Sequence, residues 1–91
     1  MEYEWDEAKA VANRHKHGVG FDAIREFDWT SALVVADDRA DYGEARWLAL
    51  GLIGERLYSL AFTIRRGRIR VISLRMASRK ERTLYEEENR R

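Results

Sequence analysis

The stretch RIRVISLRMASRKERTLY, residues Arg68–Tyr85, decides how the rest of the chain is arranged. Its first ten residues alternate as in a β-strand, and eight of them form two faces of four side chains each. One face would carry Arg70, Ile72, Leu74 and Met76, and the other would carry Ile69, Val71, Ser73 and Arg75. Directly afterwards, Ser78 and Glu81 have the spacing of a capping box, which marks a helix start. The sequence therefore predicts a strand that runs straight into a helix.

Basic residues are concentrated around this junction. Between Arg65 and Arg82 there are eight of them against one acid, Glu81, whereas the whole chain has 17 basic and 16 acidic residues. A local field of this sign and density is typical of a surface that binds phosphate. Arginine donates two parallel hydrogen bonds to such a group, and a helix N-terminus adds backbone amides. The alternative is a solvated strand edge, where cations discourage aggregation between sheets.

The composition favours one small domain. The chain has 91 residues, 45% of them hydrophobic, and we expect a single domain over residues 1–91. Cysteine is absent, which excludes disulfides and thiolate metal sites and favours a reducing compartment, the cytoplasm. The N-terminus, MEYEW, is acidic and has no apolar stretch, so no signal peptide is expected. The longest apolar run, Trp47–Ile53, has only seven residues, so no membrane span is expected.

Two helices are expected in the first third of the chain. Asp6 suits the N-cap of the first helix, and Gly18 suits a left-handed stop just past its last turn. The apolar spacing predicts that this helix buries Ala8, Val11, Ala12 and His15. A second short helix, roughly Phe21–Phe27, would bury Phe21, Ile24 and Phe27. Before them, Tyr3–Trp5 is either an edge strand or the lead-in to the first helix.

The rest of the chain predicts mostly strands. These are expected at Leu33–Ala36, Arg46–Leu52, Arg56–Arg65 and Arg68–Met76. Gly54-Glu55 and Arg66-Gly67 suit tight hairpin turns, so the strands that flank each turn should pair antiparallel. The polar segment Asp37–Glu44 should be an exposed loop. A last helix, about Arg79–Glu88, has only Leu84 and Tyr85 as large apolar groups and should dock by a narrow edge.

These elements together indicate an α+β fold. We expect a twisted, mostly antiparallel sheet of about four strands, with two N-terminal helices over one face and one C-terminal helix.

Three side chains near the cations have proton chemistry. His17, in the last turn of the first helix, can exchange a proton near neutral pH, although a helix-capping role is the alternative. Glu81 and Tyr85 lie four residues apart on the last helix and share a face; their alternatives are capping and packing. His15 and His17 point to different sides of a helix, so no metal site is expected. The sequence also contains no phosphate-binding glycine loop, G-x-S-x-G or H-E-x-x-H motif.

Three separated motifs resemble the BrnT toxins of bacterial type II toxin–antitoxin systems. They are Trp5-Asp6-x-x-Lys9-x-x-x-Asn13-x-x-Lys16-His17-Gly18-Val19-x-Phe21, Asp37-Asp38-Arg39-x-Asp41-Tyr42-Gly43-Glu44-x-Arg46 and Arg70-x-Ile72-Ser73-x-Arg75-x-Ala77-x-x-x-Glu81-x-x-x-Tyr85. The resemblance covers nearly the whole chain. It implies a RelE-like fold and a metal-independent ribonuclease that blocks translation by cutting RNA. It also implies neutralisation by a BrnA-like antitoxin, which binds operator DNA to repress the operon.

RNA cleavage without a metal requires a base for the 2′-hydroxyl proton, cations for the charge on phosphorus and an acid for the departing 5′ oxygen. Arg75 and Arg79 are the candidate cations. His17 or Tyr85 could be the acid, and Glu81 or a neutral His17 the base. Flanking RNA would be held by Lys9, Lys16, Arg70, Ser73 and Lys80. No cofactor is expected.

A different class of function remains open at this stage. A basic module could bind nucleic acid or an acidic protein partner with no chemistry of its own. An enzyme of the kind described above should arrest growth when it is expressed alone, and a passive binder should not.

Overall fold

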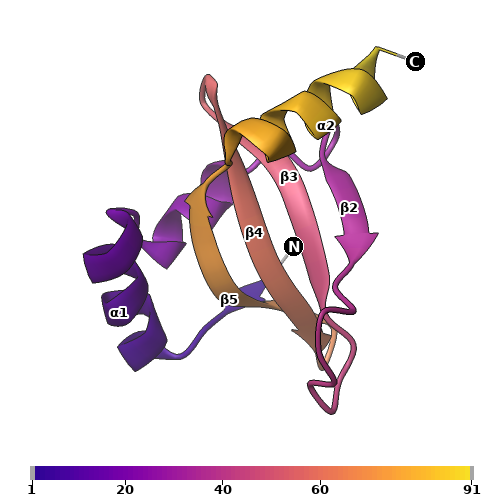
Figure 1. Ribbon diagram of the computed structural model, residues 1–91. Coiled ribbons are helices and arrows are strands. Elements are labelled where there is room, and N and C mark those ends of the chain that lie inside the picture. Colours follow the sequence, from indigo (N-terminus) through magenta and orange to yellow (C-terminus); the bar gives the residue numbers. More distant parts are fainter. Residues whose placement is uncertain (1, 91) are drawn as a thin grey trace.

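The computed structural model describes residues 2–90 of the chain. The elements follow one another as β1 (Tyr3–Glu4), α1 (Glu7–His17), the 3₁₀ helix η1 (Phe21–Glu26), β2 (Leu33–Ala36), β3 (Trp47–Ile53), β4 (Arg56–Arg65), β5 (Arg68–Met76) and α2 (Arg79–Asn89) (Figure 1). The predicted bounds of β2, β4 and β5 are confirmed, and β3 lies one residue further along than expected. None of the helices in this part of the chain is long and apolar enough to cross a membrane.

The sheet has five strands rather than the predicted four. Its order is β1-β5-β4-β3-β2, and every pair is antiparallel except β1 with β5. The additional strand is β1, in which Tyr3 pairs with Ile69 and Glu4 with Arg70. The N-terminal segment is therefore an edge strand, and it covers only the first part of the outer edge of β5.

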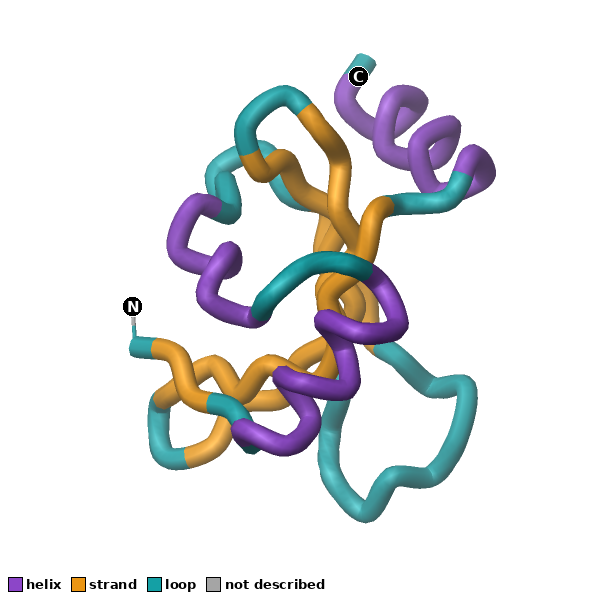
Figure 2. Tube along the Cα trace, turned by 90° about the vertical axis from the view of Figure 1, so that its left-hand side faces the viewer, coloured by secondary structure: helices purple, strands orange, loops and turns teal. Residues whose placement is uncertain are grey.

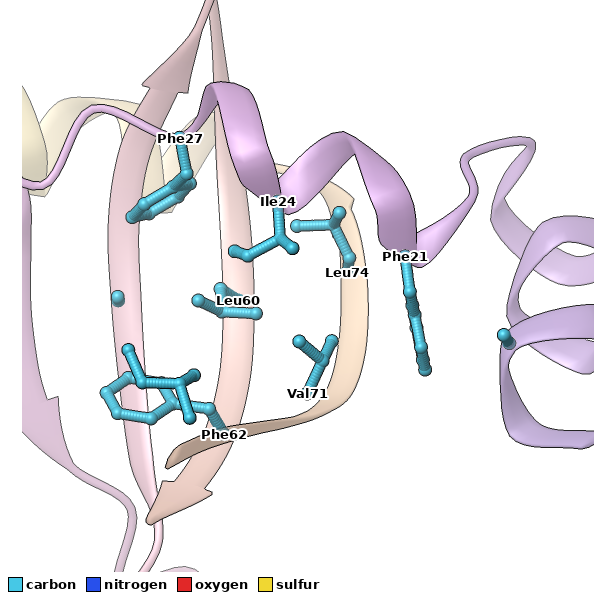
Figure 3. Packing of buried hydrophobic residues seen from close by; sticks show 10 residues of the cluster. Phe21, Ile24, Phe27, Leu60, Phe62, Val71 and Leu74 are labelled. Atoms are coloured by element: carbon cyan, nitrogen blue, oxygen red, sulfur yellow. The ribbon is translucent and has the colours of Figure 1, made fainter. Parts of the chain in front are cut away.

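One face of the sheet carries the main core, and η1 lies across it. Its Phe21, Ile24 and Phe27 are buried, as predicted, and pack with residues such as Leu60 and Leu74 (Figure 3). A 3₁₀ helix has three residues per turn, so a three-residue spacing places these side chains on one side. The expectation that two helices cover this face is wrong, because α1 lies beside β5 at the sheet edge (Figure 1).

The predicted buried face of α1 is also wrong. Asp6 and Gly18 cap the helix as expected, with Gly18 left-handed at φ 74°. However, the buried residues are Ala10 and Asn13, whereas Val11 is 50% exposed and Ala8, Ala12 and His15 face water. The prediction assumed that the small apolar residues face the core. The helix instead packs against the edge of a strand, where a polar side chain can be buried because it bonds to free backbone groups.

The other face of the sheet is covered only at its two ends (Figures 1 and 2). At one end α2 packs over a small cluster of Leu50, Leu57 and Ala77, to which Tyr85 belongs as a partly buried member. No residue of α2 is buried, which confirms the predicted narrow docking. At the other end lies the Asp37–Glu44 loop. Most of it is exposed as predicted, but Tyr42 and Glu44 are half-buried, and Asp37 is buried and bonded by Arg39.

Between these two covers lies an open stretch of sheet, which we define by Val35, Leu48, Ser73 and Arg75, all at least partly exposed. Val35 pairs with Leu48, Leu48 with Ala61 and Ala61 with Ser73, so these side chains form one row across the sheet. Arg75 pairs with Ser59 in the next row towards α2.

A β-bulge in β5 decides which side chains reach this open stretch. Phe62 pairs with Val71 and Ala61 with Ser73, so Ile72 has no partner residue on β4. The predicted strict alternation is therefore wrong: Val71 and Leu74 both lie in the main core. The extra residue changes the face of the sheet to which each later side chain of β5 points. As a result, Arg75 lies on the open stretch.

Candidate active site

The end of α1 is fixed to β5 by the side chain of Asn13. Its amide nitrogen donates to the carbonyl of Leu74 at 2.8 Å and to that of Val19 at 3.0 Å, and its oxygen accepts from the Leu74 N–H at 3.2 Å. Beyond β1, the edge of β5 would otherwise have unpaired backbone groups, which are costly when buried. Asn13 bonds to them as a neighbouring strand would, and so it determines where the last turn of α1 lies.

His17 follows Asn13 by four residues and therefore lies on the same side of α1. Partial desolvation of the ring, followed by the positive charges of Lys16 and Arg75, lowers the pKa of His17 below its ordinary value. The influence of Arg75 means that α1 and β5 bring these two side chains into one region. At neutral pH the imidazole is therefore mainly uncharged, and it can accept a proton.

Arg75 is held by Glu81 through two hydrogen bonds of 2.8 and 3.0 Å, and it also donates to the carbonyl of Met76 at 3.2 Å. The same carboxylate accepts from the N–H of Ser78, so the predicted capping box is present. Chiefly through the hydrogen bonds from Arg75, the pKa of Glu81 falls to about 2. Glu81 thus remains ionised at neutral pH and has little affinity for a proton.

Arg75 retains hydrogen-bonding capacity despite this ion pair. A guanidinium has five N–H donors, of which three are used here, so Nε and one hydrogen of Nη2 remain. Two further cations, Arg79 and Lys80, lie exposed in the first turn of α2. The arrangement can bind an anion between β5 and the start of α2.

The eight cations of Arg65–Arg82 do not form the single field that the sequence suggested. β5 holds the two ends of this segment about 25 Å apart, since a strand rises about 3.3 Å per residue. At the hairpin end, three arginines form ion pairs with carboxylates: Arg65 with Glu44 at 3.0 Å, Arg68 with Glu2 at 2.8 Å and Arg70 with Glu4 at 2.7 Å. The cations near α2 are therefore the more available group.

The structure brings some of the expected site residues together and separates others. Lys9 and Lys16 lie three or four residues from Asn13, on the β5 side of α1, and Ser73 lies on the open stretch. Tyr85 lies further across the sheet, where its ring packs on the α2 cluster and its hydroxyl donates to Oγ of Ser31 at 3.2 Å. Arg70, engaged by Glu4, belongs to the opposite end of β5.

Sequence reasoning missed the role of Asn13, because the face that it expected the first helix to bury did not include this residue. The available signal was a polar residue one turn before His17, but helix periodicity alone does not distinguish a strand-bonding amide from an exposed one.

A family model described as "Ribonuclease toxin, BrnT, of type II toxin-antitoxin system" matches residues 5–81, which include α1, the whole sheet from β2 to β5 and the capping box of α2. No curated protein matches the chain.

Proposed function

The chain belongs to the BrnT family of ribonuclease toxins of type II toxin–antitoxin systems, and from this premise we propose that it cuts RNA without a metal ion, by attack of a 2′-hydroxyl on the adjacent phosphate. The products would be a 2′,3′-cyclic phosphate and a free 5′-hydroxyl. The observation that supports this chemistry is the anchoring of α1 to β5 by Asn13, which bonds to the backbone of Leu74 at 2.8 and 3.2 Å. His17 lies one helical turn after Asn13 and Arg75 directly follows Leu74, so the two side chains come from adjoining parts of the fold.

His17 is the proposed base. A base must be unprotonated before it acts, and the lowered pKa of His17 favours that state at neutral pH. Glu81 was the other candidate, but a carboxylate with a pKa of about 2 is a weak acceptor. We assign Glu81 a positioning role, because it orients Arg75 through two hydrogen bonds.

Arg75 and Arg79 are the proposed stabilisers of the charge that develops on phosphorus. Arg75 offers its remaining donors from a fixed position, and Arg79 adds an exposed charge at the start of α2. Lys16 and Lys80 would hold the neighbouring phosphates from either side.

Tyr85 is the proposed acid for the departing 5′ oxygen. An in-line displacement needs its base and acid on opposite sides of phosphorus. His17 approaches from the outer edge of β5, and Tyr85 lies over β3 on the other side of Arg75. Transfer from Tyr85 requires its hydroxyl to leave Ser31 for the RNA.

The partner of a type II toxin is an antitoxin protein, which we propose to be BrnA-like and to repress the operon together with the toxin. The proposed place of action is the cytoplasm, where RNA is translated.

The decisive experiment incubates the purified protein with single-stranded RNA in excess chelator, with and without the antitoxin. We expect cleavage that persists in chelator, leaves cyclic-phosphate ends and stops when antitoxin is added. His17→Ala should lower kcat/KM by about 10²–10⁴-fold, the usual contribution of proton transfer. The matched control is His15→Ala, which removes the same side chain from an exposed position on another side of α1.

Two results would contradict the proposal. RNA that is bound but remains intact would support the non-catalytic module instead. Equal rates for His17→Ala and His15→Ala would remove His17 from the chemistry.

A further inference from the structure

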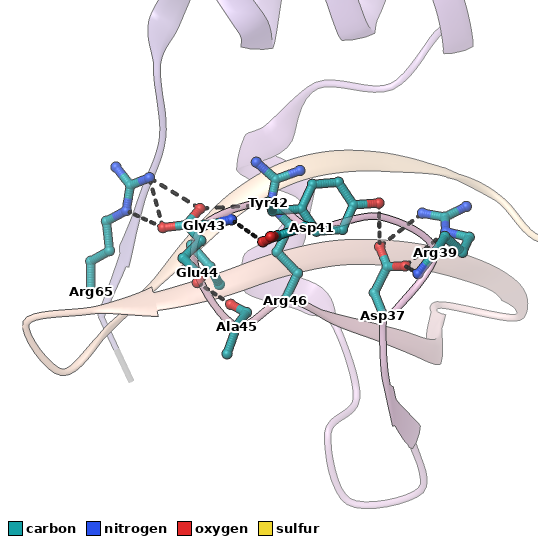
Figure 4. A network of polar contacts seen from close by, with 10 residues as sticks. Asp37, Arg39, Asp41, Tyr42, Gly43, Glu44, Ala45, Arg46 and Arg65 are labelled. Atoms are coloured by element: carbon teal, nitrogen blue, oxygen red, sulfur yellow. Dashed lines mark hydrogen bonds and ion pairs between the residues drawn. The ribbon is translucent and has the colours of Figure 1, made fainter.

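The Asp37–Glu44 loop holds an aromatic side chain against a cation at the edge of the open stretch. The guanidinium carbon of Arg46 lies 4.0 Å from the centre of the Tyr42 ring (Figure 4). Such a pair presents a flat, positively charged surface, and surfaces of this kind stack on nucleobases.

The strand register places this pair on the same face of the sheet as Arg75. Trp47 stacks on Phe62 in the main core, so Arg46, the residue before it, points to the opposite face. Figure 1 shows the loop at the end of the open stretch away from α2. The open stretch is thus bordered by the proposed cleavage site on one side and by Tyr42 and Arg46 on the other.

Within residues 2–90, one donor of Arg46 is unsatisfied. Its Nε is buried and has no hydrogen-bond partner there, although buried donors are normally paired. Its nearest carboxylate, Glu44, lies 3.6 Å away and is instead engaged by Arg65 through three hydrogen bonds of 3.0 to 3.2 Å. The side chain of Arg46 is 24% exposed, so an additional acceptor such as a phosphate would be bound by the terminal nitrogens of its guanidinium rather than by the buried Nε.

The surface between the two positions suits an extended RNA strand. It consists of Val35, which is 45% exposed, the partly exposed Leu48 and the hydroxyl of Ser73. Two residues of β4 indicate how far apart Arg75 and Arg46 lie. Ser59 is the strand partner of Arg75, and Thr63, four residues further along β4, bonds to Ala45, the residue before Arg46. This separation is about 13 Å, so a contact at Arg46 would lie beyond the nucleotides at the scissile bond.

We propose that Tyr42 and Arg46 form a second RNA subsite, in which the pair stacks on the base and binds the phosphate of a nucleotide flanking the cleavage point. The proposal rests on the proposed ribonuclease function and adds a substrate-length requirement to it. The competing explanation is that Arg46 only closes the loop by packing on Tyr42.

The test compares kcat/KM for a long single-stranded RNA with that for a short one that carries the same cleavage position but ends before the flanking nucleotide. Wild-type protein should favour the long substrate by on the order of tenfold, the usual effect of one stacked base. Arg46→Ala and Tyr42→Leu should bring this ratio towards one. Tyr42→Phe retains the ring and should retain the ratio.

Arg56→Ala is the matched control, because it removes an exposed cation from the start of β4, near the Gly54-Glu55 turn. It should leave the ratio unchanged. Melting temperatures of all variants show whether the fold is preserved.

The outcomes separate the two proposals. If the wild type cleaves neither substrate, the ribonuclease function fails. If the wild type cleaves both and Arg46→Ala lowers both rates equally, the pair has only a structural role and the subsite is overturned. The subsite is also overturned if Arg46→Ala and Tyr42→Leu leave the ratio of the two kcat/KM values unchanged. If these variants at the same time bind the antitoxin more weakly, the loop contacts protein rather than RNA.

Discussion

Asn13 shows how a single polar side chain determines the position of a catalytic group. It is 6% exposed and forms three hydrogen bonds, two of them to backbone groups of Leu74 on β5. His17 lies one helical turn away, and its ring forms no comparable hydrogen bond with any of residues 2–90. The geometry of the proposed base thus depends on an amide that does not touch the substrate.

We therefore expect Asn13→Ala to lower the free energy of unfolding by about 2–4 kcal/mol, because it leaves buried donors and acceptors unpaired. RNA cleavage should fall as well, even at temperatures where the variant remains folded. Chemical denaturation measures the first effect. Asn89→Ala is the control, since Asn89 is exposed and its side chain donates to the carbonyl of Tyr85 in its own helix; it should change stability by less than about 0.5 kcal/mol. Equal losses for both variants would contradict the anchoring role.

The pKa of His17 leads to a prediction about pH. A base works when it is unprotonated, so kcat/KM should rise with pH and level off above the pKa of His17, with a midpoint below the ordinary histidine pKa of about 6.5. The positive charge of Lys16 contributes to this lowering. Lys16→Ala should shift the midpoint upward, while Lys16→Arg should preserve it. A midpoint that does not move between these variants would show that another group titrates.

At this scale the sequence predicted the chemical character of the site better than its contacts. His17, Arg75 and Glu81 were identified as candidates from residue type and helix position. The strong pairing of Arg75 with Glu81, which makes Glu81 a poor base, depends on the end of β5 lying beside the first turn of α2. Spacing alone did not define that distance.

Among the elements, β5 connects the fold most directly to function. Its bulge at Ile72 allows Val71 and Leu74 to enter the core while Arg75 faces the open stretch. Strict alternation was the natural prediction for this strand, and it failed because a bulge has no fixed sequence signature. The ends of the strand were predictable, since Gly67 and the Ser78 cap both have local signals.

The hairpin between β4 and β5 offers a direct test of local strain. Arg66 has φ 54° and Gly67 has φ 74°, so both residues of the turn are left-handed. Arginine is disfavoured there, whereas asparagine adopts this conformation readily. Arg66→Asn should raise the free energy of unfolding by about 0.5–1 kcal/mol. Arg66→Ala removes the same charge, but alanine does not favour the left-handed conformation, so this variant should not be more stable than the wild type. If both variants are stabilised, the cause is relief of charge repulsion instead.

In the molecule as a whole, the sheet separates basic residues that lie close together in the sequence. Three arginines at the hairpin end of the sheet pair with Glu2, Glu4 and Glu44, while Arg75 and the exposed Arg79 and Lys80 lie at the other end of β5, at the proposed cleavage site. The family and the general fold were predictable, because separated motifs and turn signals run along the whole chain. The division of charge was not predictable, because its acidic partners come from β1 and the Asp37–Glu44 loop, distant in sequence.

This division predicts which cations control RNA affinity. Each lysine or arginine that contacts a phosphate releases counterions, so removing it should reduce the slope of log affinity against log salt by about 0.7 for single-stranded RNA. We expect this loss for Lys80→Ala and for Arg79→Ala, measured by fluorescence anisotropy with an uncleavable RNA over a range of salt concentrations. Arg68→Ala removes an equal charge at the hairpin end, where Glu2 already engages it at 2.8 Å, and its slope should match that of the wild type. If Arg68→Ala lowers the slope as much as Lys80→Ala does, RNA extends along the hairpin end of the sheet as well, and the binding surface is larger than the one between α1 and α2.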